Sequence, residues 1–179
     1  CTLCLLEISV VIVGPFHKIG IFILRPICHN PLILWFHAWL SDTTELFEYG
    51  SLQIGYADGA QETFDFPANH PLAGKEVAAF YFWVFPNMMF NFYPWGLSVN
   101  IVKPHSVSKT KVSFITYVYD ETKYGEYEGL LVDKVEREDE FVVEGVYQGL
   151  HSRFYKSGRF SPSREQGVHH FHRMLADRC

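Results

Sequence analysis

The chain has 179 residues, of which 48% are hydrophobic and 17% are aromatic, and its formal net charge is −5. This length and composition are typical of one globular domain with a sizeable core. The acidic balance, without a face of clustered Lys and Arg, argues against nucleic-acid binding. No run reaches about 18 uninterrupted apolar residues, so we expect no membrane-spanning helix and no membrane partner.

The four cysteines lie near the two ends and in one isolated segment, at Cys1, Cys4, Cys28 and Cys179. This is not the regular spacing of a disulfide framework, so we expect a reducing compartment and a cytoplasmic location. Cys1 and Cys4 form a C-x-x-C pair, but no second pair stands at zinc or iron–sulfur spacing. We interpret the pair as chance.

Residues 1–42 differ in character from the rest of the chain. They form apolar runs interrupted by Pro15, Lys18, Arg25 and Pro26, with no initiator Met and no positively charged start of a signal peptide. The regular patterns begin at Thr43. We therefore divide the chain into an atypical segment, 1–42, and a domain, 43–179.

Five strands are predicted from alternating or continuous apolar patterns bounded by turn residues. They are Leu46–Tyr56, Ala78–Phe85, Met88–Tyr93, Leu97–Val102 and Lys111–Tyr119. Short turns such as Pro86-Asn87 and Pro94-Trp95-Gly96 predict an antiparallel meander. Two helices, from about Asp133 to Leu150 and from Ser163 as N-cap to Ala176, are expected to cover one side, which makes an α+β domain with a curved sheet wrapped around a helix.

One carboxylate stands out in the first of these helices. Asp139 falls on the same stripe as the apolar residues Leu131, Val135, Val142 and Val146 when the segment is projected at about 100° per residue. A carboxylate that points into an apolar setting needs a partner. The partner can be an Arg or Lys, a set of hydrogen-bond donors, or a metal ion.

Roughly three quarters of the chain, from about Thr43 to Leu175, resembles a known family. The segments that carry the resemblance are Tyr81–Gly96, Arg137–Gly149, Ser152–Tyr155, Gly158–Ser161 and Glu165–His172. They look like the C-terminal catalytic domain of Rieske non-haem iron ring-hydroxylating oxygenase large (alpha) subunits, closest to the branch that acts on quaternary ammonium compounds. The resemblance implies a helix-grip (START/SRPBCC-like) fold, an antiparallel sheet around a long C-terminal helix, here incomplete at its N-terminus.

The same resemblance implies a role for Asp139. In that family an Asp spaced like Asp139 from Glu144 and Gln148 is the carboxylate of a two-His, one-carboxylate iron site, which suits oxygen activation. The family's H-x-x-x-x-H pair is absent, because His17, His29 and His37 do not have that spacing. The positions of the two iron histidines therefore cannot be assigned, and we hypothesise that residues 1–42 are not native family sequence.

The implied function is that of an oxidoreductase. A full-length relative would use mononuclear Fe(II) and O₂ as a monooxygenase or dioxygenase, to hydroxylate or oxidatively demethylate a small aromatic or quaternary ammonium substrate. Electrons would come from NAD(P)H through a reductase or ferredoxin and a 2Fe–2S Rieske cluster in an N-terminal domain outside this sequence. The resemblance also implies a homotrimer, and this fragment alone is expected to be inactive. The alternative is a non-catalytic helix-grip module that binds an apolar small molecule.

Other candidate residues have a structural interpretation beside the functional one. Phe90, Phe92 and Trp95 are candidates for a substrate pocket, although aromatic residues in this density also build a core. His169 and His172 share a helix face but lack a helpful carboxylate, so we expect packing contacts from this histidine cluster and no metal site. Glu144 is expected to be structural.

Overall fold

The computed structural model describes residues 4–12, 43–57, 61–106, 108–122, 141–162 and 165–178. Several residues singled out above lie outside these ranges: His17, His29, His37 and Asp139. The predictions made for them are therefore not tested by the structure.

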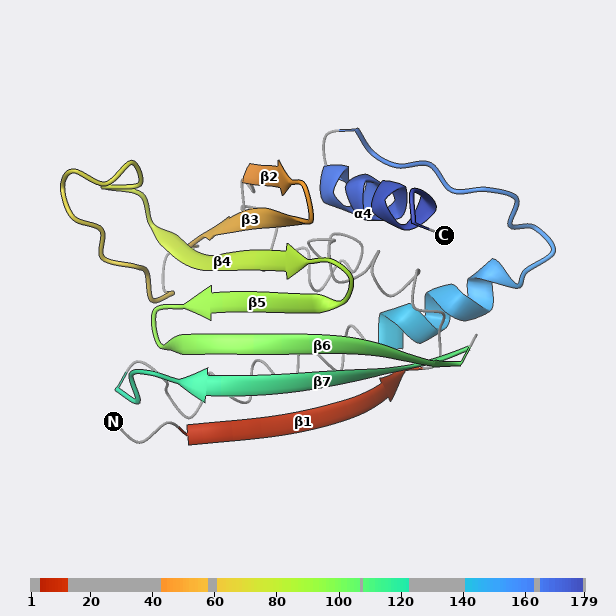
Figure 1. The fold of residues 1–179 in the computed structure, drawn as a ribbon, viewed down its shortest axis with the longest axis horizontal. Helices are drawn as coiled ribbons and strands as arrows, with labels where there is room; N and C mark the ends of the chain where they lie inside the picture. The colour runs from red at the N-terminus through yellow and green to blue at the C-terminus, as the bar shows by residue number, and fades with distance from the viewer. Residues whose placement is uncertain are drawn as a thin grey trace.

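The described strands form one seven-stranded sheet in the order β1-β7-β6-β5-β4-β3-β2, with every pair antiparallel (Figure 1). The strands are β1 Cys4–Ile12, β2 Thr43–Phe47, β3 Gly50–Tyr56, β4 Val77–Val84, β5 Met88–Tyr93, β6 Gly96–Ser106 and β7 Lys109–Val118. From β2 to β7, each strand pairs with the next one in the chain. The predicted antiparallel meander is confirmed.

Two strand predictions were wrong in their boundaries. Leu46–Tyr56 is not one strand, because β2 ends at Phe47 and β3 starts at Gly50 after a turn at residues 48 and 49. The turn has no Pro, Asn or Asp to mark it, and Gly50 is needed because a Cβ there would collide with the carbonyl oxygen of Trp83 on β4. Similarly, β6 continues through the predicted turn at Pro104, with a shift of its register against β7 between Pro104 and Ser106.

The strand β1 comes from the segment that the sequence sets apart. Its backbone pairs with β7 from Cys4 opposite Val118 to Ile12 opposite Thr110, and it forms one edge of the sheet. Residues 4–12 are thus part of the same sheet as the rest of the chain. The division at residue 42 stays a prediction about the origin of the segment.

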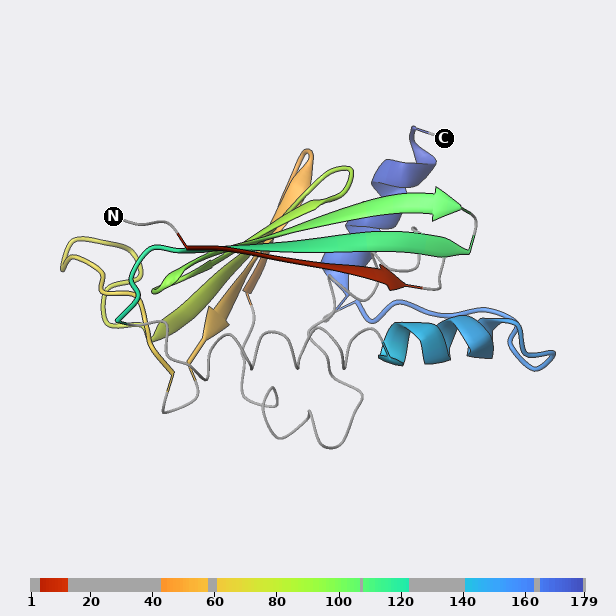
Figure 2. The ribbon, with the colours of Figure 1, turned by 90° about the horizontal axis from the view of Figure 1, so that it is seen from below.

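The core lies on one face of the sheet, which we call the inner face. It joins Trp83, Met89, Val102, Val112 and Phe114 of the sheet to Val143 of the helical segment 141–150 and to Phe171 and Met174 of the last helix, α4, Gln166–Ala176. The rings of Trp83 and Phe171 meet edge to face, with their centroids 4.9 Å apart. Figure 2 shows the segment 141–150 on one side of the sheet, and this is the side of the inner face because Val143 of that segment belongs to the core cluster. The α+β antiparallel architecture is confirmed, whereas a sheet wrapped around one long C-terminal helix stays a prediction.

The two helical segments differ from the prediction in detail. The N-cap of α4 is Glu165, not Ser163. The buried Glu165 carboxylate accepts a hydrogen bond from the Ser161 backbone N–H at 2.6 Å, which fixes the chain just before the helix. In the segment 141–150 the buried residue is Val143, and Val146, predicted to be on the apolar stripe, is 40% exposed. The buried stripe is therefore rotated around the helix by less than a quarter turn from its predicted position.

Candidate functional site

A row of polar side chains crosses the inner face of the sheet. Tyr81, Asn91, Ser98 and Thr116 are register partners on four adjacent strands, β4 to β7. They lie on the inner face because Tyr81 and Asn91 stand two residues from the core residues Trp83 and Met89, and side chains two apart on a strand share a face. Neighbouring strands are about 4.8 Å apart, so the row spans roughly 14 Å.

The row continues into a buried hydrogen bond on β6. Ser98 Oγ donates to Asn100 Oδ1 at 3.1 Å, and both residues are buried. Because the oxygen of the Asn100 amide is engaged, its nitrogen is the group that can donate to a ligand. From Tyr81 to Thr116, the row consists of neutral groups that combine donors and acceptors.

Aromatic rings flank the row on its β4 and β5 side. Tyr93 lies two residues from Asn91 on the same face of β5. Its ring is stacked on the buried ring of Trp95, with centroids 4.8 Å apart and planes 5° apart, and it meets Tyr81 edge to face at 6.1 Å. The three rings form a cluster that we call the tyrosine–tryptophan cluster.

The ring of Tyr81 owes its place to a glycine on β3. A Cβ added at Gly55 would come 2.9 Å from Cε2 of Tyr81, a distance that real Cβ atoms do not adopt without a shift of the neighbour. Gly55 thus leaves room for the Tyr81 ring on the inner face. The sequence predicts β3 but gives no signal for this contact, because it depends on the register between β3 and β4.

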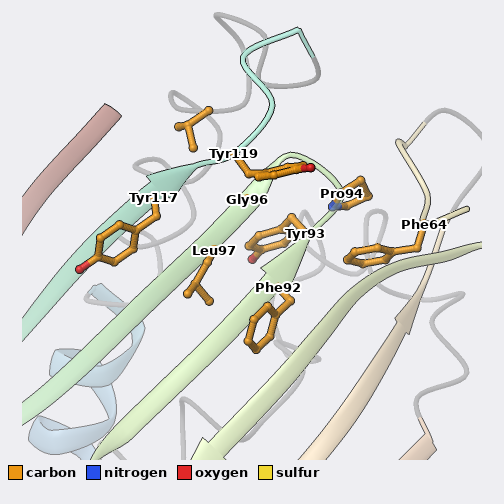
Figure 3. A pocket seen from close by; sticks show the side chains of 9 residues that line it. Phe64, Phe92, Tyr93, Pro94, Gly96, Leu97, Tyr117 and Tyr119 are labelled. Carbon is orange, nitrogen blue, oxygen red and sulfur yellow. The ribbon is translucent and has the colours of Figure 1, made fainter. Parts of the chain in front are cut away.

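The predicted pocket residues do not come together at one place. Phe90 and Phe92 alternate with Met89 and Asn91 on β5, so they lie on the opposite, outer face of the sheet. Phe92 contributes to an open groove of ≈ 390 Å³ at this end of the sheet, and Phe64, Pro94, Leu97, Tyr117 and Tyr119 also line it (Figure 3). Tyr93 of the tyrosine–tryptophan cluster lines the same groove. Trp95 belongs to the tyrosine–tryptophan cluster. A substrate role for Phe90, Phe92 and Trp95 stays a prediction.

The histidines near the C-terminus make packing contacts, as expected. Nε2 of His170 lies 2.7 Å from the backbone carbonyl oxygen of Phe47 on β2. His169 and His172 each have the ring of Phe160 at a centroid distance of 5.3 Å. These contacts seat α4 against the edge of the sheet and against the segment before the helix.

Metal-ligating side chains do not gather within the described ranges. No group of three or more His, Cys, Asp or Glu that could hold a metal ion occurs among those residues. Asp139, the predicted iron ligand, lies outside them. Glu144, two positions beyond Val142 in the helical segment, is half-buried, and its expected structural role stays a prediction.

Comparison with known protein families identifies one that includes these residues. Residues 55–179 match the model of the ring hydroxylating alpha subunit (catalytic domain) family. The chain belongs to the ring-hydroxylating alpha-subunit family. This match covers most of the sheet, the polar row, the tyrosine–tryptophan cluster and both helical segments, and it confirms the resemblance to this family.

Curated relatives of this family member are plant choline monooxygenases. The chain is 35% identical over 140 residues to the chloroplastic enzyme of Arabidopsis thaliana, a match that covers 74% of this chain and 31% of the relative. It is 33% identical over 103 residues to the chloroplastic enzyme of Spinacia oleracea, covering 54% of this chain and 23% of the relative. The chain thus spans less than a third of the length of these relatives.

Solved structures show that the ring-hydroxylating family member shares its fold with Rieske monooxygenases. A quaternary ammonium Rieske monooxygenase, CntA, superposes with a TM-score of 0.75 at 20% identity, over 98% of this chain and 50% of that one. Dicamba monooxygenase in complex with 3,6-dichlorosalicylic acid gives a TM-score of 0.61 at 12% identity, over 98% of this chain and 58% of that one. Within the part of the chain that the structure describes, no helix is long and apolar enough to cross a membrane.

Proposed function

We propose that this chain is the catalytic-domain part of a Rieske-type monooxygenase that acts on a small quaternary ammonium compound. The observation that carries the proposal is the tyrosine–tryptophan cluster on the inner face. Tyr81 and Tyr93 present aromatic faces and edges on the side of the sheet that the helices cover, and aromatic faces attract quaternary ammonium groups. The similarity to choline monooxygenases and to a quaternary ammonium monooxygenase supports the same substrate class.

The family match favours this enzyme over the non-catalytic module. A module for an apolar ligand would suit a wholly apolar inner face, whereas the row of Asn91, Ser98 and Thr116 is polar. Side chains that can donate and accept hydrogen bonds suit a ligand with polar atoms better than a wholly apolar one.

Iron is the group that the family implies for the reaction. When bound, iron would supply the activation of O₂ for hydroxylation or oxidative demethylation. Asp139 would provide the carboxylate ligand, and the positions of the two histidines are not assigned. In the sequence, Asp139 falls on the predicted apolar stripe with Val142, which supports a role in which its carboxylate meets a partner inside the domain. A carboxylate at that position fits the charge and hardness of Fe(II).

The rest of the machinery belongs to a longer protein, which the proposal requires because the chain spans only part of its relatives. We propose a 2Fe–2S Rieske cluster in its N-terminal part, a reductase or ferredoxin as electron donor drawing on NAD(P)H, and a homotrimer. Inter-subunit electron transfer is described for CntA, which supports an assembly of several subunits. The cytoplasmic location stays a prediction, and the plant relatives are chloroplastic.

Replacement of the proposed ligand tests the iron site. In the longer parent protein, Asp139→Ala should lower the iron affinity by more than about 100-fold, since changes to residues that merely support a ligand already cost about 10–100-fold. The measurements are iron content by elemental analysis and product formation with choline, together with the circular dichroism spectrum to confirm folding. Glu144→Ala, five residues further along the chain, is the matched control and should retain iron. Normal iron content in the Asp139 variant would refute the assignment.

A further inference from the structure

The polar row lies beside the tyrosine–tryptophan cluster, and Asn91 is the residue that joins the two. On its own strand, Asn91 has Tyr93 as its neighbour on the inner face. Across the strands its register partners are Tyr81 on β4 and Ser98 on β6. The amide therefore stands between two phenol rings on one side and the hydroxyls of the row on the other.

The distance between the two sides matches a small bifunctional molecule. Two strand spacings, about 10 Å, separate β4 with its Tyr81 ring from β6 with Ser98 and Asn100. A trimethylammonium group at the rings would leave a chain of a few atoms to run across Asn91. The far end of such a molecule would meet Asn91, the amide of Asn100 and, one strand further, the hydroxyl of Thr116.

The chemistry of the row indicates what that far end carries. At the described inner-face positions of β4 to β7, from Val77 to Val118, no Asp, Glu, Lys, Arg or His occurs. Amide N–H and hydroxyl groups donate to oxygen, and the Ser98–Asn100 hydrogen bond leaves the Asn100 nitrogen as a donor. An oxygen atom in the same place could accept from these groups, whereas a methyl group could not.

We propose that Asn91 and Thr116 of the polar row, together with Asn100 beside the row on β6, form a specificity determinant that selects quaternary ammonium substrates bearing an oxygen acceptor a few atoms from the cation. The inference rests on the proposed function, because it needs the cation at Tyr81 and Tyr93. Two sources of oxygen share this chemistry, a hydroxyl as in choline and a carboxylate as in γ-butyrobetaine, a substrate of CntA. Hydrogen bonds to the row distinguish either compound from a bare tetraalkylammonium ion.

Three probes separate the two halves of the site. Tetramethylammonium carries the cation alone, choline adds a hydroxyl, and γ-butyrobetaine adds a carboxylate. Their dissociation constants are measured by isothermal titration calorimetry on the 179-residue chain and on two variants, Asn91→Leu and Thr116→Val. Asn91 is only partly buried, so its variant is expected to fold even if a change at the buried Thr116 is not tolerated.

The control is Ser113→Ala, because Ser113 is a buried hydroxyl on the same strand as Thr116 but on the outer face. The two residues are similarly enclosed, 7% exposed for Ser113 and 8% for Thr116. We expect Asn91→Leu and Thr116→Val each to weaken binding of an oxygen-bearing probe by about 3- to 10-fold, the usual effect of one lost hydrogen bond. Binding of tetramethylammonium, and all binding by Ser113→Ala, should stay unchanged.

Each outcome decides the proposal. A selective loss for choline identifies a hydroxyl as the bound oxygen, a selective loss for γ-butyrobetaine identifies a carboxylate, and a loss for both shows that the row accepts either. An equal loss for all three probes would overturn the role of the row, because it would show that the substitutions disturb the cation site itself. No loss in well-folded variants would overturn that role and leave the cation site in place. Failure of tetramethylammonium to bind the unaltered chain would overturn the proposed function itself, and the inference with it.

Discussion

The two faces of the sheet differ in composition although they are built from the same strands. The outer face of β4 and β5 carries Phe80, Phe82, Phe90 and Phe92, and the rings of Phe82 and Phe92 meet edge to face at 5.8 Å. The inner face alternates rows of apolar residues with the polar row. An apolar face is stabilised simply by its removal from water. A polar row that is removed from water loses its hydration, and a bound polar ligand can offset that free-energy cost. This difference is why we assign ligand recognition to the inner face and packing to the outer one.

The largest effect should come from the core on the inner face. Phe171→Ala removes a ring that is 1% exposed and packed on Trp83, and it should lower the free energy of unfolding by about 3–5 kcal/mol. Phe92→Ala on the outer face, where the ring is 40% exposed, should cost about 1–2 kcal/mol. Urea denaturation of both variants measures the difference. Equal losses would show that the outer face is as tightly packed as the inner one.

A smaller effect should separate the aromatic rings of the two faces. Tyr81→Leu should weaken binding of tetramethylammonium by about 3- to 30-fold, because a cation–π contact contributes about 0.5–2 kcal/mol. Tyr117→Leu, which changes a tyrosine in the outer groove, should leave that affinity unchanged. Calorimetric titration gives both constants. If only the Tyr117 variant lost affinity, the cation-binding site would have to be assigned to the outer groove instead.

The smallest effect should follow from moving one ring without removing it. Gly55→Ala forces the Tyr81 ring away from its place, because the new Cβ would lie 2.9 Å from Cε2. We expect affinity for tetramethylammonium to fall by about 2- to 5-fold, within the range of an exposed cation–π contact. Gly145→Ala is the control, since its Cβ would meet nothing within 4 Å. Unchanged affinity in a folded Gly55 variant would show that the position of Tyr81 does not matter for binding.

The strands and helices could be predicted where the sequence carries a local signal. The prediction for Met88–Tyr93 is correct to the residue because turn residues stand on both sides of it. The β2–β3 hairpin could not be predicted, because apolar alternation runs through both strands and the turn between them contains no residue typical of turns. Ser163 is a plausible N-cap for α4 because Ser is a common cap, whereas the structure uses a buried Glu165 that accepts from the Ser161 backbone.

Only part of the candidate site could be predicted from the sequence. Asp139 could be singled out because helical periodicity and the spacing to Glu144 and Gln148 are both local patterns, and its role stays a prediction. The polar row could not be found, because its members lie on four strands and meet only through the register of the sheet. Phe90 and Phe92 stand out in the sequence only for the density of aromatic residues around them. Neighbours on a strand alternate between faces, so density alone does not tell which ring faces the helices.

The order of the strands has a consequence for how the chain folds. From β2 to β7 every pairing joins strands that follow each other in the sequence, and such local contacts form quickly. The pairing of β1 with β7 closes a loop from Ile12 to Thr110, which costs far more chain entropy. The six-strand meander should therefore assemble first and expose β7 as a free edge until β1 adds to it. During synthesis, β1 emerges first and must wait for its partner strand, so it is the part of the described sheet most exposed to wrong pairings before folding is complete.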